Sequence, residues 1–276
     1  MNQSSVDQYR VFGNPIKQSR SPAIHQAFAK STSQNLSYES QLVALDAFAE
    51  TIAQFMASGG KGANITVPFK EQALALCDTL SERARLAAAV NTLTFKNGKI
   101  YGDNTDGLGL VQDLLRHQVK LKGCKILLLG AGGAAKGVIL PLLAQAPTSI
   151  VIANRTVSKA EKLCQQFNSE KLSACSFEEA SQAQYDVIIN ATSASLSGSV
   201  PPISADLINA NVVCYDMVYG KGLTPFLSWA QQLHAAQIID GLGMLVGQAA
   251  ESFNIWRGVM PETENVLVSL RQSIDA

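Results

Sequence analysis

The chain has 276 residues, of which 47% are hydrophobic and 16% are charged. This length and composition suit one large or two ordinary globular domains and exclude a disordered, collagen-like or coiled-coil chain. The 22 basic residues balance the 22 acidic ones, so no overall field attracts nucleic acid or an anionic membrane. We therefore expect a small-molecule partner, with no nucleic acid and no membrane.

The five cysteines form no CxxC pair, and the three histidines are equally scattered. This pattern is typical of reduced thiols in a cytoplasmic protein and predicts no metal site. We expect no signal peptide, because no basic segment followed by an apolar one begins the chain. The longest apolar run, Ile126–Ala135, is too short to span a membrane, so we expect a soluble cytoplasmic protein.

Residues 1 to about 102 mix short strands and helices with polar clusters. Tyr9–Gly13 is predicted as a strand, and the next helix is predicted to have Ser21 as its N-cap and Pro22 at its first position. Ala63–Val67 is predicted as another strand. A hairpin with a two-residue turn is predicted from three successive segments, Thr92–Lys96, Asn97–Gly98 and Lys99–Tyr101.

Two charged residues are candidates for acid–base chemistry. Lys70 lies in the first turn of a helix predicted to start at Pro68, where the helix dipole disfavours a cation. It is a candidate acid–base group, although a surface lysine is an equally good explanation. Asp106 precedes a predicted helix, and an N-cap role explains one carboxylate there, but not both Asp103 and Asp106. The spacing does not show whether Lys70 and Asp106 meet.

The most informative motif is a glycine-rich turn between an apolar strand, Cys124–Leu129, and a helical stretch, Lys136–Ala144. The turn has the pattern GxGxxA, in which Gly130 permits a tight turn and Gly132 lets the backbone approach a pyrophosphate. We favour a dinucleotide site over an ordinary glycine-rich turn. The residues predicted to bind the cofactor here are Gly130, Ala131, Gly132, Gly133 and Ala134.

The end of the next predicted strand, Ile150–Ala153, indicates which nicotinamide cofactor binds. NAD sites usually place a carboxylate there, whereas this chain has Asn154, Arg155 and Thr156, with Lys159 a turn later. A guanidinium, a hydroxyl and an ammonium group suit a 2′-phosphate, so NADP(H) is predicted. The alternative is that the two cations only form a solvated helix start.

Strands and helices alternate from about residue 123 to 240, and the residues from Gly241 onward are helical in pattern, with a break at Pro261. An ordered series of polar and glycine-containing segments runs through the chain: Gly13–Ile16, Ser19–Pro22, Asn64–Lys70, Ala89–Thr92, Asp103–Gly107, Gly130–Ala135, Asn154–Thr156, Asp216–Tyr219 and Asp240–Gln248. In these segments the chain resembles the shikimate dehydrogenase family from end to end.

The resemblance implies NADPH-dependent reversible reduction of 3-dehydroshikimate to shikimate, in the pathway through chorismate to the aromatic amino acids. It implies Lys70 as the acid–base residue and Asp106 as its partner. The substrate residues it implies are Ser19, Ser21, Asn64, Thr66, Lys70, Asn91, Asp106, Tyr219 and Gln248. Hydroxyl and amide groups suit a polyhydroxylated acid. Ser21 as a cap, Asn91 as a turn former and Gln248 as a surface residue remain structural alternatives.

For the cofactor, the resemblance adds Thr192, Met217, Gly241 and Glu82. It also implies a two-domain α/β architecture. Residues 1–102 and 241–276 would form an α/β substrate-binding domain, and 103–240 a doubly wound, Rossmann-type NADP-binding domain. We expect a monomer or a homodimer.

One segment departs from the family pattern. The family commonly has a glycine near position 195, where this chain has Ala194, Ser195 and Leu196, and a positive φ there would be costly for serine. Two other functions stay open: an NAD-linked quinate/shikimate dehydrogenase of broader specificity, and a nucleotide-sensing protein without turnover. An acid at the end of the second strand would favour the first, and loss of Lys70 and Asp106 the second.

Overall fold

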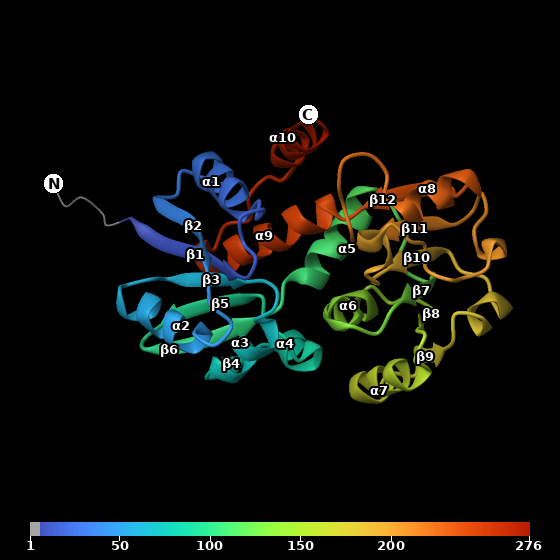
Figure 1. The fold of residues 1–276 in the computed structure, drawn as a ribbon, viewed down its shortest axis with the longest axis horizontal. Helices are drawn as coiled ribbons and strands as arrows, with labels where there is room; N and C mark the ends of the chain where they lie inside the picture. Colours follow the sequence, from blue (N-terminus) through green and yellow to red (C-terminus); the bar gives the residue numbers. More distant parts are fainter. Residues whose placement is uncertain (1–5) are drawn as a thin grey trace. The chain divides into compact units, whose positions relative to one another are not determined.

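A computed structural model describes residues 6–276. Contacts divide the chain into two compact units. Unit 1 contains the residues up to Gly109 and Val246–Val268, and unit 2 contains Leu110–Leu245 and Ser269–Ala276. Each unit has its own six-stranded sheet. The strands of both sheets can be followed by their labels in Figure 1.

Unit 1 is built on a mixed sheet with the strand order β2-β1-β3-β5-β6-β4. Its strands are β1 (Asp7–Gly13), β2 (Leu36–Leu42), β3 (Gly62–Ile65), β4 (Thr79–Leu80), β5 (Thr92–Lys96) and β6 (Lys99–Asp103). The helices are α1 (Ser21–Ser31), α2 (Phe48–Ala57), α3 (Lys70–Leu76), α4 (Glu82–Ala87) and most of α9 (Leu242–Arg257). Strand β3 runs parallel to β1 and antiparallel to β5.

The two faces of this sheet bury different apolar clusters. Phe48, Ile52 and Phe55 of α2 pack with sheet residues on one face, where α3 and α4 also lie. On the other face, Tyr9 stacks on Trp256 of α9 with their ring centroids 4.6 Å apart. Apolar burial on both faces explains why this unit has its own core.

Three sequence predictions are wrong in detail here. Ser21 is not an N-cap: the Arg20 carbonyl accepts the first helical hydrogen bond, from Ile24 N at 3.1 Å, so Ser21 is the first helical residue. The predicted strand 63–67 ends at Ile65, because the chain turns at residues 67–69 and leaves Val67 66% exposed. Helix α3 therefore begins at Lys70 rather than at Pro68.

The hairpin prediction is confirmed. Strands β5 and β6 pair antiparallel, and the turn residues Asn97 and Gly98 have φ values of 54° and 73°. Positive φ values at both central residues are what a two-residue type I′ turn requires. The break near Pro261 is also confirmed, since it separates α9 from α10 (Glu264–Asp275).

Unit 2 is a doubly wound sheet with the strand order β12-β11-β10-β7-β8-β9, and every neighbouring pair is parallel. Its strands are β7 (Lys125–Leu129), β8 (Ser149–Ala153), β9 (Leu172–Cys175), β10 (Val187–Asn190), β11 (Val213–Asp216) and β12 (Gln237–Asp240). This order is that of dinucleotide-binding folds, in which ligands bind beyond the carboxyl ends of the strands. The expected α/β, Rossmann-type class is confirmed.

Helices cover both faces of this sheet. Apolar residues of α5 (Asp106–Arg116), α6 (Gly133–Ala144) and α7 (Val157–Phe167) pack on one face. Helix α8 (Pro225–Gln232) and the 3₁₀ helices η1 (Glu179–Gln182) and η3 (Ala205–Leu207) pack on the other. Within residues 6–276, we find no helix with the length and apolarity to cross a membrane.

Candidate active site

Lys70 and Asp106 meet in unit 1. Lys70 is the first residue of α3 and Asp106 is the first residue of α5. The Lys70 Nζ atom donates to Asp106 Oδ2 at 2.6 Å, and the two side chains are 30% and 16% exposed. The pair is thus partly desolvated but still open to a ligand.

Asn91 fixes the acid of this pair. Its Nδ2 atom donates to Asp106 Oδ1 at 2.8 Å, and its Oδ1 atom accepts from Thr105 N at 2.9 Å. The Asn91 carbonyl accepts from Ile65 N, at the end of β3. The side chain of Gln248, from α9, reaches Asn91 with Oε1 3.4 Å from Nδ2. Three segments distant in sequence are therefore joined around one carboxylate.

Asp103 has a separate structural role. Arg83 of α4 binds its carboxylate through two hydrogen bonds, from Nε at 2.7 Å and from Nη2 at 2.6 Å. Ser81 Oγ and Asn104 N donate to the same carboxylate at 2.6 and 2.7 Å. This bidentate pair holds the segment that leads from β6 to Asp106, which explains the second acid of the motif.

Asn64 lies in a buried polar cluster that the sequence did not reveal. Tyr38 donates to its Oδ1 atom at 2.7 Å, and its Nδ2 atom donates to Ser252 Oγ at 2.9 Å and to Thr92 Oγ1 at 3.2 Å. Ser252 is fully buried and lies one helical turn after Gln248. A serine at a core-facing position of a helix is the signal that could have pointed to it.

The other expected substrate residues are placed as follows. Ser19 Oγ accepts from Ser21 N at 3.4 Å, and Ser21 is buried at the start of α1. Thr66 follows β3 directly and packs against Gly13, at the end of β1. Tyr219 belongs to unit 2, whereas the other eight belong to unit 1.

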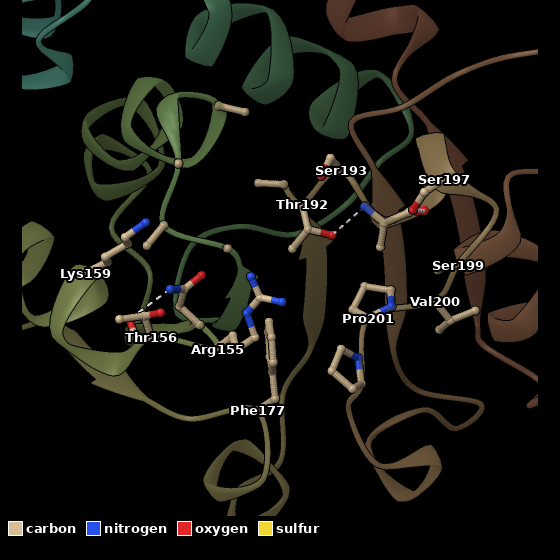
Figure 2. Close-up of a pocket in the computed structure, with 18 of the residues that line it drawn as sticks. Arg155, Thr156, Lys159, Phe177, Thr192, Ser193, Ser197, Ser199, Val200 and Pro201 are labelled. Carbon is tan, nitrogen blue, oxygen red and sulfur yellow. Dashed lines mark hydrogen bonds between the residues drawn. The ribbon is translucent and has the colours of Figure 1, made fainter.

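Unit 2 contains a cavity of about 670 Å³ at the carboxyl end of its sheet. Figure 2 shows Arg155 and Lys159 on one side of it and the segment from Thr192 to Pro201 on the other. The lining includes every residue predicted from the glycine turn and from the end of β8, together with Thr192: Gly130, Ala131, Gly132, Gly133, Ala134, Asn154, Arg155, Thr156 and Lys159. Phe177, Ser197, Ser199 and Val200 also line it and were not predicted.

The glycine turn fits a pyrophosphate. Gly132 is the N-cap residue of α6, so no side chain caps the first amide groups of that helix. A Cβ atom on Gly132 would meet nothing within 4 Å, which shows that the space beside it is open. Gly130 has a φ of 103°, a conformation that favours glycine. Free amide groups and the helix dipole together attract an anion.

The end of β8 fits a 2′-phosphate. Arg155, Thr156 and Lys159 are exposed at the start of α7, whose first turn contains no acid. The Asn154 side chain donates to the Thr156 carbonyl at 2.9 Å and so shapes this corner. Two cations without an acid at a helix start are unfavourable unless an anion binds between them.

Met217 and Gly241 meet at the carboxyl ends of β11 and β12. A Cβ atom on Gly241 would lie 2.1 Å from the Met217 carbonyl oxygen, so only glycine allows this approach. Glu82 is the first residue of α4, in unit 1. Ser195 lies in the 3₁₀ helix η2 (Ala194–Ser197) and does not have a positive φ, so serine adopts its conformation there without the expected backbone strain. The left-handed residue of this loop is Gly198, with a φ of 73°.

The cysteines are not reactive groups of this site. Burial raises the pKa of Cys77 to about 11 and that of Cys214 to about 12, so both thiols are protonated at neutral pH. In the part of the chain that the structure describes, no three His, Cys, Asp or Glu side chains gather as metal ligands would.

A doubly wound sheet with a glycine turn that fits a phosphate, together with a lysine–carboxylate pair in a second unit, is typical of nicotinamide-dependent oxidoreductases. Three family models match the chain: the shikimate dehydrogenase substrate binding domain over residues 11–93, shikimate / quinate 5-dehydrogenase over 112–197, and the shikimate 5′-dehydrogenase C-terminal domain over 241–268. The chain is 64% identical to shikimate dehydrogenase (NADP(+)) of Colwellia psychrerythraea, over 99% of this chain and 100% of that one. The chain belongs to the shikimate dehydrogenase family.

Solved structures agree. An enzyme from Pseudomonas putida superposes with a TM-score of 0.93 at 44% identity, over 96% of this chain and 98% of that one. Shikimate 5-dehydrogenase from Thermus thermophilus, solved in complex with NADP(H) and shikimate, superposes with a TM-score of 0.87 at 31% identity, over 97% and 100% of the two chains.

Proposed function

We propose that the protein catalyses the reversible, NADPH-dependent reduction of 3-dehydroshikimate to shikimate. The observation that carries this proposal is the full-length similarity to a relative named for this activity and this cofactor. The geometry of each unit supports the roles that we propose for its residues.

Lys70 serves as the acid–base group. When bound, NADPH supplies a hydride, and a ketone that accepts one gains negative charge on its oxygen. The Lys70 ammonium stabilises that charge and donates a proton to the oxygen in reduction; in oxidation its neutral amine accepts the proton. Asp106, 2.6 Å from Nζ, orients the amine and offers its carboxylate to a substrate hydroxyl.

The substrate is a small polyhydroxylated acid. Donors and acceptors converge on one end of the unit 1 sheet, and each hydroxyl of a ligand that leaves water needs such a partner. We assign Ser19 and Ser21 to the substrate carboxylate. The residues assigned to the carboxylate or the ring hydroxyls are Thr66, Asn91, Tyr219 and Gln248, and Asn64 is assigned a place near the substrate.

The cofactor is NADP(H). The uncapped start of α6 would hold the pyrophosphate, and Arg155, Thr156 and Lys159 would hold the 2′-phosphate. Thr192, Met217 and Gly241 would lie toward the nicotinamide, and Glu82 is assigned less directly. A cytoplasmic location and a monomeric or homodimeric state stay predictions.

The experiment that tests the function is a steady-state assay of the purified protein, following NADPH absorbance. We expect kcat/KM for shikimate with NADP⁺ to exceed that for quinate with NAD⁺ by at least about a hundredfold, since a lost phosphate contact to two cations costs about 3 kcal/mol. A preference for quinate with NAD⁺ would identify the broader dehydrogenase. NADPH binding without turnover of either acid would identify a sensor.

A further inference from the structure

Unit 2 contains a buried carboxylate to which the proposed chemistry gives no role. Asp216 ends β11 and is fully buried. Burial raises the pKa of its carboxyl group, while four hydrogen-bond donors act in the opposite direction. All four donors are uncharged. A buried carboxylate is costly unless it is well hydrogen-bonded, so the four donors offset the cost of burying Asp216.

Two hydroxyl groups donate to one oxygen of this carboxylate. Ser195 Oγ and Thr224 Oγ1 each lie 2.6 Å from Asp216 Oδ2. The other oxygen, Oδ1, accepts from Asn190 Nδ2 and from Val218 N, each at 3.1 Å. O–H···O distances this short are typical of bonds to an ionised acceptor, which are the stronger class.

The donors come from three different segments. Asn190 and Ser195 belong to the end of β10 and the η2 loop after it. Val218 lies two residues after the end of β11, and Thr224 is the N-cap residue of α8, where its hydroxyl also accepts from Leu227 N. Asp216 therefore ties the β10 loop to the start of α8 and to the segment that contains Met217.

The β10 loop is also the wall of the cofactor cavity. Thr192 donates through both N and Oγ1 to Asn190 Oδ1, at 3.1 and 2.7 Å, and its Oγ1 accepts from Ala194 N at 3.2 Å. Thr192, Ala194 and Ser197 line the cavity, as Figure 2 shows for the labelled Thr192 and Ser197. Ser195, 8% exposed, lies between them and turns inward to Asp216. The residues of this wall that line the cavity therefore lie on one side of it, and the hydrogen bond from Ser195 to Asp216 lies on the other.

We propose that Ser195 and Asp216 form a positioning pair that holds the 191–199 wall of the dinucleotide cavity in its binding geometry. The inference rests on the proposed NADP(H) function. Ser195 acts through the wall and touches no reacting atom, so it affects cofactor affinity rather than the chemical step.

The test is the dissociation constant of NADPH for the full chain, measured by titration calorimetry, together with kcat and both KM values. Ser195→Ala should weaken NADPH binding about tenfold, the worth of one hydrogen bond to a charged group. KM for shikimate and kcat at saturating cofactor should stay within about twofold of wild type. Ser195→Gly removes the same hydroxyl and provides the same test if the alanine variant does not fold.

Two controls separate a positioning role from a merely structural one. Thr224→Val removes the other short bond to Asp216 Oδ2 from a residue outside the cavity lining, so it should lower the melting temperature while changing NADPH affinity less than twofold. Ser204→Ala removes an exposed serine–aspartate contact, with Asp206 at 3.1 Å, and the N-cap of η3, and it should change NADPH affinity less than twofold.

Equal losses of affinity in Ser195→Ala and Thr224→Val, or an unchanged affinity in Ser195→Ala, would overturn the pair's role. A wild-type protein that does not bind NADPH at all would instead refute the cofactor assignment on which the inference rests.

Discussion

At the scale of single residues, the Lys70 ammonium is directed at one oxygen of Asp106 while Asn91 holds the other. An unsupported carboxylate could rotate away from the lysine, whereas this one is fixed from both sides. The lysine is still 30% exposed, so a ligand oxygen can reach Nζ without breaking the pair. This combination suits proton transfer better than a surface salt bridge, which contributes little to stability.

Lys70→Ala should lower kcat by about 10²–10⁴-fold, with a KM change of no more than a few-fold, because the variant removes a group needed mainly in the transition state. The measurement is steady-state oxidation of shikimate. Lys61→Ala, at an exposed lysine before β3, is the matched control and should retain wild-type rates. A kcat within tenfold of wild type for Lys70→Ala would remove this lysine from the mechanism.

His25 makes the stability of the protein depend on pH. It is 1% exposed, its ring stacks on Tyr38 with centroids 4.1 Å apart, and neither ring nitrogen has a hydrogen-bond partner in residues 6–276. Burial lowers the pKa of His25 to about 3, so the folded protein keeps this ring neutral. The unfolded chain binds the proton at its ordinary pKa of about 6.5. Stability is therefore present above that value and is lost as the pH falls toward 3.

Between pH 7 and pH 5 this group should lower the free energy of unfolding by about 2 kcal/mol. His25→Phe keeps an aromatic ring in the stack and should remove that part of the pH dependence. Urea unfolding at the two pH values, followed by tryptophan fluorescence, measures it; Trp256 lies 5.4 Å from the His25 ring. His234→Asn, at an exposed position, is the matched control for loss of a histidine. An unchanged pH dependence in His25→Phe would contradict the assignment.

At the scale of elements, hydrophobic pattern and turn chemistry predicted most of the fold. The strand, GxGxxA turn and helix of residues 124–144 are found as β7 and α6, and the Asn97–Gly98 hairpin is found as β5 and β6. The boundaries of elements near proline were less predictable. Helix α3 begins at Lys70 rather than at Pro68, because proline is favoured both in turns and at the first position of a helix.

Contacts between distant segments could not be predicted in the same way. Lys70 and Asp106 are 36 residues apart, and they meet because β3 pairs with β5 and β5 with β6 in one register. No local pattern encodes that register. The hydrogen bonds to Asp216 were not predicted for the same reason, since their donors come from three segments that only the parallel sheet brings together.

Gly241 shows how closely the strand ends of unit 2 approach. Gly241→Ala would place a Cβ atom 2.1 Å from the Met217 carbonyl oxygen, a backbone atom that cannot rotate away. We expect a loss of about 2 kcal/mol in the free energy of unfolding, typical of overpacking. Gly220→Ala is the matched control, because a Cβ there meets nothing within 4 Å. Equal melting temperatures of the two variants would show that the segment after β11 relaxes freely.

At the scale of the whole molecule, the two units divide the two proposed ligands. Unit 1 contains Lys70, Asp106 and most of the proposed substrate residues, whereas unit 2 contains the dinucleotide cavity. Each unit has its own sheet and its own apolar core, so each can gain stability from its own ligand.

Hydrogen exchange followed by mass spectrometry should show this division. NADP⁺ alone, at about a hundred times its dissociation constant, should slow exchange in the segments around 130–135, 154–159 and 191–199, since binding at that excess adds about 2.7 kcal/mol to the stability of the bound form. Shikimate alone should slow exchange around 64–70, 89–92 and 103–107, and in unit 2 only around 217–220. Shikimate protection spread over the cavity segments, or NADP⁺ protection confined to unit 1, would contradict the assignment of the ligands to the units. Because exchange is compared peptide by peptide in the intact chain, the result does not depend on turnover and tests binding separately from the chemistry of Lys70.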